Sequence, residues 1–204
     1  LYMLFSAHQS QAASCIVLLV GLHVDDLIII GITKHSDWFR KKMKEEFKMD
    51  DLGQPNMLLG VDITYCQEGD IIMHMSTYIQ KVAKRFSFDQ CGSKTSSNVP
   101  MLPGNRLSKE QEAQSPDEIK GFPYRELVAC LLYIAVCIGP DIAYTVKELS
   151  RFLINPGTAM VRAAKQLLRY VIQRNKLGLK FSAQVKHVLG SICKTTSTAP
   201  FSAY

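Results

Sequence analysis

Two short runs of branched and aliphatic residues flank an adjacent pair of aspartates in the first part of the sequence. The runs are Ile16–Leu22 and Leu27–Ile32, and the four residues between them are His23, Val24, Asp25 and Asp26. Runs of this length and composition favour buried β-strands, and the short connection favours a tight hairpin. Because burying an unpaired charge is costly, the stretch is a poor membrane span, and we expect the aspartates at the turn.

The acidic pair has a specific chemical use if it lies at a turn. Neighbouring residues on a flat strand point to opposite faces, whereas a turn lets both side chains approach one site. Mg²⁺ prefers oxygen ligands and often uses one or two carboxylates together with substrate phosphates. Asp25 and Asp26 are therefore a candidate metal-binding pair. The alternative is an ordinary solvated turn, which Asp favours through local hydrogen bonds.

The apolar pattern in the rest of the chain predicts a mixture of strands and helices. Ser36 is a candidate helix N-cap, and apolar residues recur after it at helical spacing. Strands are expected at 57–65 and 71–75, with helices opening at residue 76 or 77, at Pro123, near 142 and near 158. Residues 92–121 are rich in Ser, Pro, Gly and charge, which predicts a long connection between two lobes.

The whole chain has a net charge of +6. The positive charge is concentrated in its second half. Residues 101–204 contain 14 Lys and Arg against seven Asp and Glu, whereas residues 1–100 contain 10 against 11. Arg162, Lys165 and Arg169 recur three and four positions apart, so they share one stripe of the last expected helix. Such a stripe suits a phosphate backbone. A solvated helix face is the alternative.

Cysteine usage and the apolar segment bear on location. The six cysteines show neither the short spacing of zinc sites nor a disulfide framework, which favours a reducing compartment. No basic leader with a cleavage site accompanies the first apolar run. We therefore expect an intracellular protein, cytoplasmic or nuclear, that is neither secreted nor embedded in a membrane.

Five blocks of the sequence, in order, resemble motifs of copia-type retrotransposon reverse transcriptases. The blocks are LLVGLHVDDLIIIG, FKMDDLGQPNMLLGVDI, STYIQKVAKRFSFDQC, FPYRELVACLLYIAVCIGPDIAYTVKELSRFLINPG and AAKQLLRYVIQRNKLGLKFS. The first block is similar to the family's strand–YVDD–strand motif, and the second to its acidic-Leu-Gly turn and following strand. The third is similar to its YI-x-KVL-x-RF helix and the fourth to its PYR…RPDI…SRF…NP segment. The fifth is similar to its final helix and strand. The resemblance covers residues 16–182.

The resemblance implies an α+β fold. It implies a partial right-hand polymerase palm over residues 15–91, with an antiparallel β-hairpin, further strands and packed helices. A linker at 92–121 and a mostly helical thumb or connection lobe at 122–182 would follow. Residues 1–14 are expected to be an irregular lead and residues 183–204 an irregular tail.

The resemblance also implies a function for the intact enzyme: RNA-directed DNA polymerisation by two-metal nucleotidyl transfer. The implied partners are an RNA or DNA template–primer and a dNTP. Asp25 and Asp26 would be the catalytic, Mg²⁺-binding aspartates, and His23 and Val24 would lie near the primer. Arg162, Lys165 and Arg169 would contact the nucleic-acid backbone.

The sequence departs from the family at points that affect activity. His23 stands where the family usually has Tyr, and Ile138-Gly139 stands where Thr-Arg usually precedes Pro-Asp-Ile. None of residues 1–24 is Asp or Glu, so neither the family's third catalytic aspartate nor its fingers are in these 204 residues. We expect the C-terminal half of a polymerase region, ending before ribonuclease H and inactive without the missing half. The alternative is a non-catalytic, transposon-derived remnant that binds nucleic acid or protein.

Overall fold

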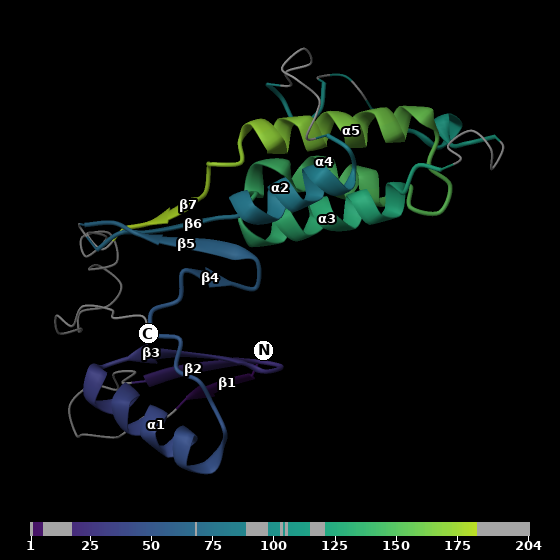
Figure 1. The fold of residues 1–204 in the computed structure, drawn as a ribbon. Coiled ribbons are helices and arrows are strands. Elements are labelled where there is room, and N and C mark those ends of the chain that lie inside the picture. The colour runs from purple at the N-terminus through teal and green to yellow at the C-terminus, as the bar shows by residue number, and fades with distance from the viewer. Residues whose placement is uncertain are drawn as a thin grey trace. The chain divides into compact units, whose positions relative to one another are not determined.

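The computed structural model describes residues 2–5, 18–67, 69–88, 98–102, 104, 106–114 and 121–182 (Figure 1). Internal contacts divide the described chain into two units, one formed by residues before Met57 and one by Met57–Ser182. Each unit contains its own antiparallel sheet. The mixed α+β class expected from the sequence is therefore confirmed.

The first unit is a three-stranded antiparallel sheet with one helix. Its strands are β1 (Tyr2–Phe5), β2 (Leu18–His23) and β3 (Asp26–Gly31), in the order β1-β2-β3. Leu18 and Val20 are buried at alternate positions of β2, and Ile29 is buried on β3. This alternation is the period of a strand with one covered face. Strand β1 lies within residues 1–14, where the sequence shows no period.

Helix α1 (Thr33–Glu46) follows β3 directly and packs Phe39 against the small core of the first unit. The prediction that Ser36 caps this helix was wrong. The carbonyl of Ile32 already accepts hydrogen bonds from the N–H groups of His35 and Ser36, so the helix begins one turn earlier. Ser36 is fully buried inside the helix instead.

The second unit contains a four-stranded antiparallel sheet. Its strands are β4 (Met57–Leu58), β5 (Val61–Tyr65), β6 (Ile71–His74) and β7 (Leu179–Phe181), in chain order. The single strand predicted at 57–65 was wrong, because Leu59 and Gly60 form a turn in which φ is +49° and +78°. Two successive positive φ values are typical of a tight hairpin turn. Such turns favour Asn, Asp or Gly, so Leu at the first position does not indicate a turn in the sequence.

Helices α2 (Ser76–Arg85), α3 (Tyr124–Cys137), α4 (Ala143–Ser150) and α5 (Thr158–Gln173) lie side by side in the second unit (Figure 1). Short 3₁₀ turns occupy Lys109–Gln111 and Pro140–Ile142. One core joins all four helices, and its fully buried side chains include Leu127, Leu131, Val146, Leu149, Leu167 and Leu168. Burial of each such side chain contributes about 1.5–3 kcal/mol. The helices expected at residue 76, after Pro123 and near 158 are confirmed.

Some expectations lie outside what the structure describes. The proposed tail at 183–204, most of the proposed lead and nearly half of the proposed linker fall on residues that are not described. The lobe boundaries proposed from the sequence therefore stay a prediction. Among the described helices, none is both long enough and apolar enough to cross a membrane.

Candidate active site

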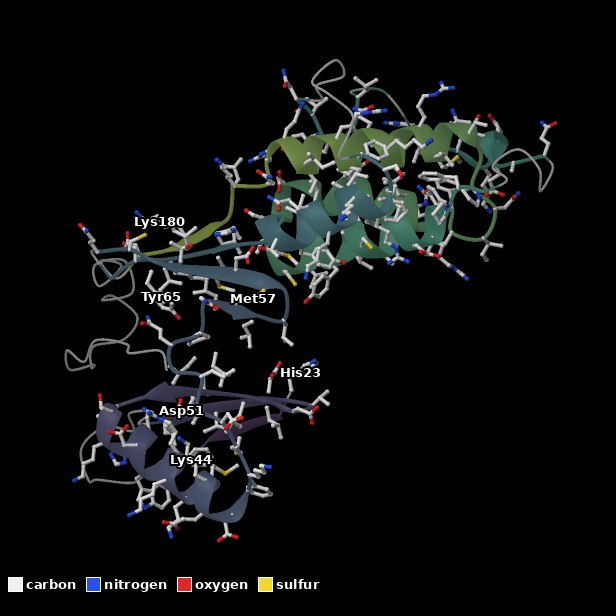
Figure 2. All side chains as sticks on the ribbon, in the orientation of Figure 1. His23, Lys44, Asp51, Met57, Tyr65 and Lys180 are labelled. Atoms are coloured by element: carbon white, nitrogen blue, oxygen red, sulfur yellow. The ribbon has the colours of Figure 1, made fainter. Side chains whose placement is uncertain are left out.

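The aspartate pair occupies the turn end of the β2–β3 hairpin, as the sequence predicts. His23 is paired with Asp26 and Leu22 with Leu27, so only Val24 and Asp25 form the loop. Both aspartates, His23 and Val24 are exposed, and Figure 2 shows His23 at the turn end of these strands. The hairpin thus presents its two carboxylates to solvent from a paired, antiparallel scaffold.

The backbone at this turn is strained. Val24 has a φ of +52°, and its side chain is 81% exposed. A β-branched residue rarely adopts positive φ, because its side chain crowds the backbone there. Such residues cost about 1–3 kcal/mol and persist where the surrounding structure enforces them, often at functional sites. Here the enforcing structure is the ladder of β2 and β3.

Close packing behind the turn fixes the hairpin. Gly21 on β2 lies opposite Ile28 on β3. A Cβ atom added at Gly21 would lie 2.8 Å from the Cγ2 atom of Ile28, so the bulk of Ile28 occupies this position of the ladder. Larger side chains at position 21 would push the strands apart or displace Ile28. The sheet therefore holds the register that places Asp25 and Asp26 at the end.

The two Asp-Asp pairs of the chain differ in their surroundings. Asp51 accepts a hydrogen bond from the Gly53 N–H at 3.1 Å and lies 3.4 Å from Arg40 and 3.6 Å from Lys44. Figure 2 shows Lys44 and Asp51 in this first unit. By contrast, no described residue forms a hydrogen bond or ion pair with the carboxylates of the hairpin. Asp51 serves the local structure, whereas the hairpin carboxylates are available to a ligand.

The donor set at the hairpin fits a partial Mg²⁺ site. Adjacent carboxylates supply hard oxygen ligands, and exposure leaves room for water and phosphate oxygens in the remaining positions. Within the described ranges, no group of three or more His, Cys, Asp or Glu side chains is arranged to hold a metal ion. Asp25 and Asp26 could therefore hold one ion only with ligands from outside this hairpin.

The proposed basic stripe lies along α5, but its members have different surroundings. Arg162 is exposed. The Lys165 Nζ atom lies 4.4 Å from the ring centroid of Phe122, and the Arg169 guanidinium lies 5.3 Å from that of Phe88. Cation–π contacts of this kind contribute about 0.5–1 kcal/mol at exposed sites. Two of the three cations thus also stabilise the chain segments that cover α5.

A further polar cluster in the second unit has no signal in the sequence. Asp141 accepts hydrogen bonds from the Tyr170 hydroxyl and from Arg174, which are 29 and 33 residues away. No local spacing reveals groups so far apart, and only the packing of α5 against the 3₁₀ turn brings them together.

Comparison with known proteins agrees with the sequence motifs. Residues 7–103 match the family described as reverse transcriptase (RNA-dependent DNA polymerase). A Saccharomyces cerevisiae protein assigned to transposon Ty5-1 is 29% identical over 181 residues, covering 88% of this chain and 57% of the relative. The retrovirus-related Pol polyprotein from transposon TNT 1-94 of Nicotiana tabacum is 33% identical over 156 residues, covering 74% of this chain. The retrovirus-related Pol polyprotein from transposon RE1 of Arabidopsis thaliana is 28% identical over 155 residues, which also cover 74% of this chain.

The similarity covers only part of each relative. The chain spans 57% of the Ty5-1 protein, 11% of the TNT 1-94 polyprotein and 10% of the RE1 polyprotein. No solved structure matches the chain.

Proposed function

Because residues 7–103 belong to the reverse transcriptase family and the chain is distantly homologous to copia-type Pol polyproteins, we propose that the β2–β3 hairpin is the metal-holding hairpin of an RNA-directed DNA polymerase. One observation carries the proposal. Asp25 and Asp26 lie side by side at the exposed end of a paired hairpin, and no described residue neutralises them.

Each residue of the hairpin has a role in this proposal. Asp25 and Asp26 would hold Mg²⁺, which the family typically requires, and a bound ion would neutralise charge on the phosphates during nucleotidyl transfer. His23 and Val24, which directly precede the two aspartates, would lie against the primer end. The strained Val24 backbone would fix the direction of the neighbouring aspartate side chains. In this account the first unit and the β4–β6 strands correspond to palm, and the later helices to thumb or connection.

The 204 residues hold an incomplete catalytic set. In-line phosphoryl transfer by two metal ions needs more ligands than two carboxylates, and residues 1–24 contain no Asp or Glu. We therefore expect no primer extension by this chain alone. Its carboxylates could still hold an ion whose remaining positions are filled by water or phosphate oxygens.

The test measures binding of a template–primer duplex to the full 204-residue chain with and without Mg²⁺. We expect Mg²⁺ to tighten binding several-fold, because an ion held by the hairpin can bridge to a phosphate. The double variant Asp25→Asn/Asp26→Asn should lose this effect while keeping the metal-independent affinity. An Mg²⁺ effect of equal size in the double variant would contradict the proposal, as would primer extension that survives Asp25→Asn.

The charge distribution supports a second candidate function, a non-catalytic nucleic-acid-binding module. Arg162, Lys165 and Arg169 lie on successive turns of α5 in the more basic half of the chain. Each phosphate contacted would add about 0.9 to the log–log slope of affinity against salt on a duplex. This function predicts salt-sensitive binding that is indifferent to Asp25 and Asp26, so the same titration separates the two candidates.

A further inference from the structure

A cavity of about 190 Å³ lies in the second unit, far along the sequence from the hairpin. It opens where the C-terminal ends of α3 and α5 meet the first turn of α2 and the start of β7. Its apolar wall includes Ile79, Ile142, Val171 and Leu179. An apolar cavity of about 150 Å³ is large enough to hold a benzene ring. The space therefore suits one planar ring.

Asp141 and Arg174 form a fixed pair at the rim of this cavity. One Arg174 nitrogen lies 2.6 Å from the Oδ2 atom of Asp141, and the Tyr170 hydroxyl donates to the same oxygen at 2.8 Å. The guanidinium also lies over the Tyr170 ring, 5.1 Å from its centroid. Because Tyr170 is buried in the core, it orients both charged groups.

The pair keeps hydrogen-bonding capacity for a ligand. The side chains of Asp141 and Arg174 are 41% and 42% exposed. The Oδ1 atom of Asp141 has no hydrogen-bond donor among the described residues, and a guanidinium has five N–H groups, of which few are used here. One partner can therefore accept a hydrogen bond from a ligand while the other donates one.

The charge of the rim selects against ions. An anionic ligand would pair with Arg174 and be repelled by Asp141. A cationic ligand would pair with Asp141 and be repelled by Arg174. A neutral group with a carbonyl oxygen beside an N–H satisfies both side chains at once. An amide edge attached to a planar ring has this pattern.

Gly139 contributes to the opening of the cavity because it has no side chain. A Cβ atom there would lie 3.0 Å from the Cγ1 atom of Ile142 and 3.3 Å from the Ile134 carbonyl oxygen. A side chain at this position would crowd the wall that Ile142 forms. The sequence thus leaves the ring-sized space open beside the charged pair.

We propose that this cavity is a binding site for a planar, uncharged ring that carries an amide edge. The ring would pack among the apolar side chains, its N–H group would donate to Asp141, and its carbonyl would accept from Arg174. A carboxamide on an aromatic ring and the edge of a nucleobase share this chemistry. The site is separate from the hairpin and does not depend on the proposed polymerase function.

The first experiment titrates the full 204-residue chain with three probes of one shape, observed by NMR. Benzamide is neutral, benzoate is anionic and benzamidine is cationic. We expect benzamide to bind at least fivefold more tightly than either charged probe. Uracil, titrated in parallel, distinguishes a nucleobase source from a carboxamide source. If neither benzamide nor uracil binds more tightly than the charged probes, the proposal is overturned.

Two rim variants test the role of the pair independently of the cavity. Asp141→Asn leaves a net positive rim, so benzoate should become the preferred probe by about fivefold. Arg174→Gln leaves a net negative rim, so benzamidine should become the preferred probe by a similar factor. Both positions are partly exposed, so circular dichroism should show an unchanged fold. A probe order that neither substitution alters would overturn the assignment of the pair.

Discussion

His23 and Asp26 lie directly opposite each other as the last residue pair of the β2–β3 ladder. This pairing leaves a loop of two residues, Val24 and Asp25. Two-residue hairpin loops need positive φ at the first position, which Gly, Asn and Asp adopt more easily than Val. The structure accordingly places Val24 at a φ of +52°. The sequence therefore keeps an unfavourable residue beside the carboxylates.

Replacing Val24 by a residue that tolerates this backbone should stabilise the hairpin. We expect Val24→Asn to raise the free energy of opening of β2–β3 by about 1 kcal/mol, because Asn adopts positive φ at a lower cost. Hydrogen exchange of the amides that bond across the β2–β3 ladder measures this change. Val24→Thr keeps the β-branch and serves as the control, with no gain expected. Equal protection in Val24→Asn and Val24→Thr would show that Val24 is not strained.

The Tyr124 hydroxyl should stabilise the second unit at neutral pH and cease to do so in strong alkali. The hydroxyl is buried and donates to the Leu149 carbonyl at 2.9 Å, linking α3 to α4. Tyr124→Phe should lower the free energy of unfolding by about 1–3 kcal/mol, since the carbonyl loses its donor. Urea denaturation at pH 7 measures the loss. Tyr144→Phe, at a residue that is 65% exposed, is the control and should change little.

The pH dependence of this contribution has a definite sign. Burial raises the pKa of Tyr124 above its ordinary value of 10.0. The contribution is therefore complete below pH 10 and is lost as the pH rises toward the folded-state pKa. Tyr124→Phe should remove this alkaline component of the stability curve. An unchanged alkaline slope in the variant would contradict the role of this hydroxyl.

Asp51 should give the first unit an acid-sensitive component of stability. The Gly53 N–H lowers the pKa of Asp51 most strongly. Burial opposes this effect, and the charges of Lys44 and Arg40 lower the pKa further. With a folded pKa below the ordinary value of 3.8, the contribution is complete at neutral pH. It is lost as the pH falls below about 4 through the folded-state pKa.

The measurement compares unfolding of the Asp51→Asn variant with that of the wild type between pH 2 and 6. Asp51→Asn should flatten the acid limb of the curve for α1 and the loop after it, observed by hydrogen exchange. Asp50→Asn changes the adjacent exposed residue and is the control. If both variants flatten the curve equally, the effect does not come from the hydrogen bond of Asp51.

Gly178 should be intolerant of a side chain because of its position beside β6. A Cβ atom there would overlap the Met73 carbonyl oxygen and lie 3.0 Å from the His74 Cβ atom. Gly178→Ala should therefore displace β7 and cost about 1–3 kcal/mol, a magnitude typical of overpacking. Thermal unfolding of the full chain measures this cost. A Cβ at Gly139 would crowd its neighbours but approach none closer than 3.0 Å, so Gly139→Ala should cost less. The opposite order would argue against the β6–β7 pairing.

The sequence predicts those parts of the structure in which local pattern and tertiary packing agree. The apolar runs around Asp25 and Asp26 favour strands, and the sheet uses them as strands. Helix α5 likewise follows its periodic apolar positions, such as Leu168 and Val171, which are buried. In both cases the same side chains that set the local preference also fill the core.

The remaining features depend on contacts that local pattern does not contain. The turn at Leu59-Gly60 and the positive φ at Val24 oppose the preferences of Leu and Val, so pairing of the strands imposes them. The aromatic neighbours of Lys165 and Arg169 come from distant segments. The Asp141–Arg174 pair arises only after α5 packs against the turn that begins at Pro140.

If Asp25 and Asp26 hold metal, a divalent ion should bind at the end of the β2–β3 hairpin. Mn²⁺ can replace Mg²⁺ as a paramagnetic probe, and it broadens the NMR signals of nearby amides. We predict selective broadening at His23, Asp26 and Leu27 of the full chain. Asp25→Asn/Asp26→Asn should abolish this broadening, whereas the control Asp50→Asn/Asp51→Asn should retain it. Broadening that is absent from the hairpin, or that persists in Asp25→Asn/Asp26→Asn, would contradict a metal-holding role for these carboxylates.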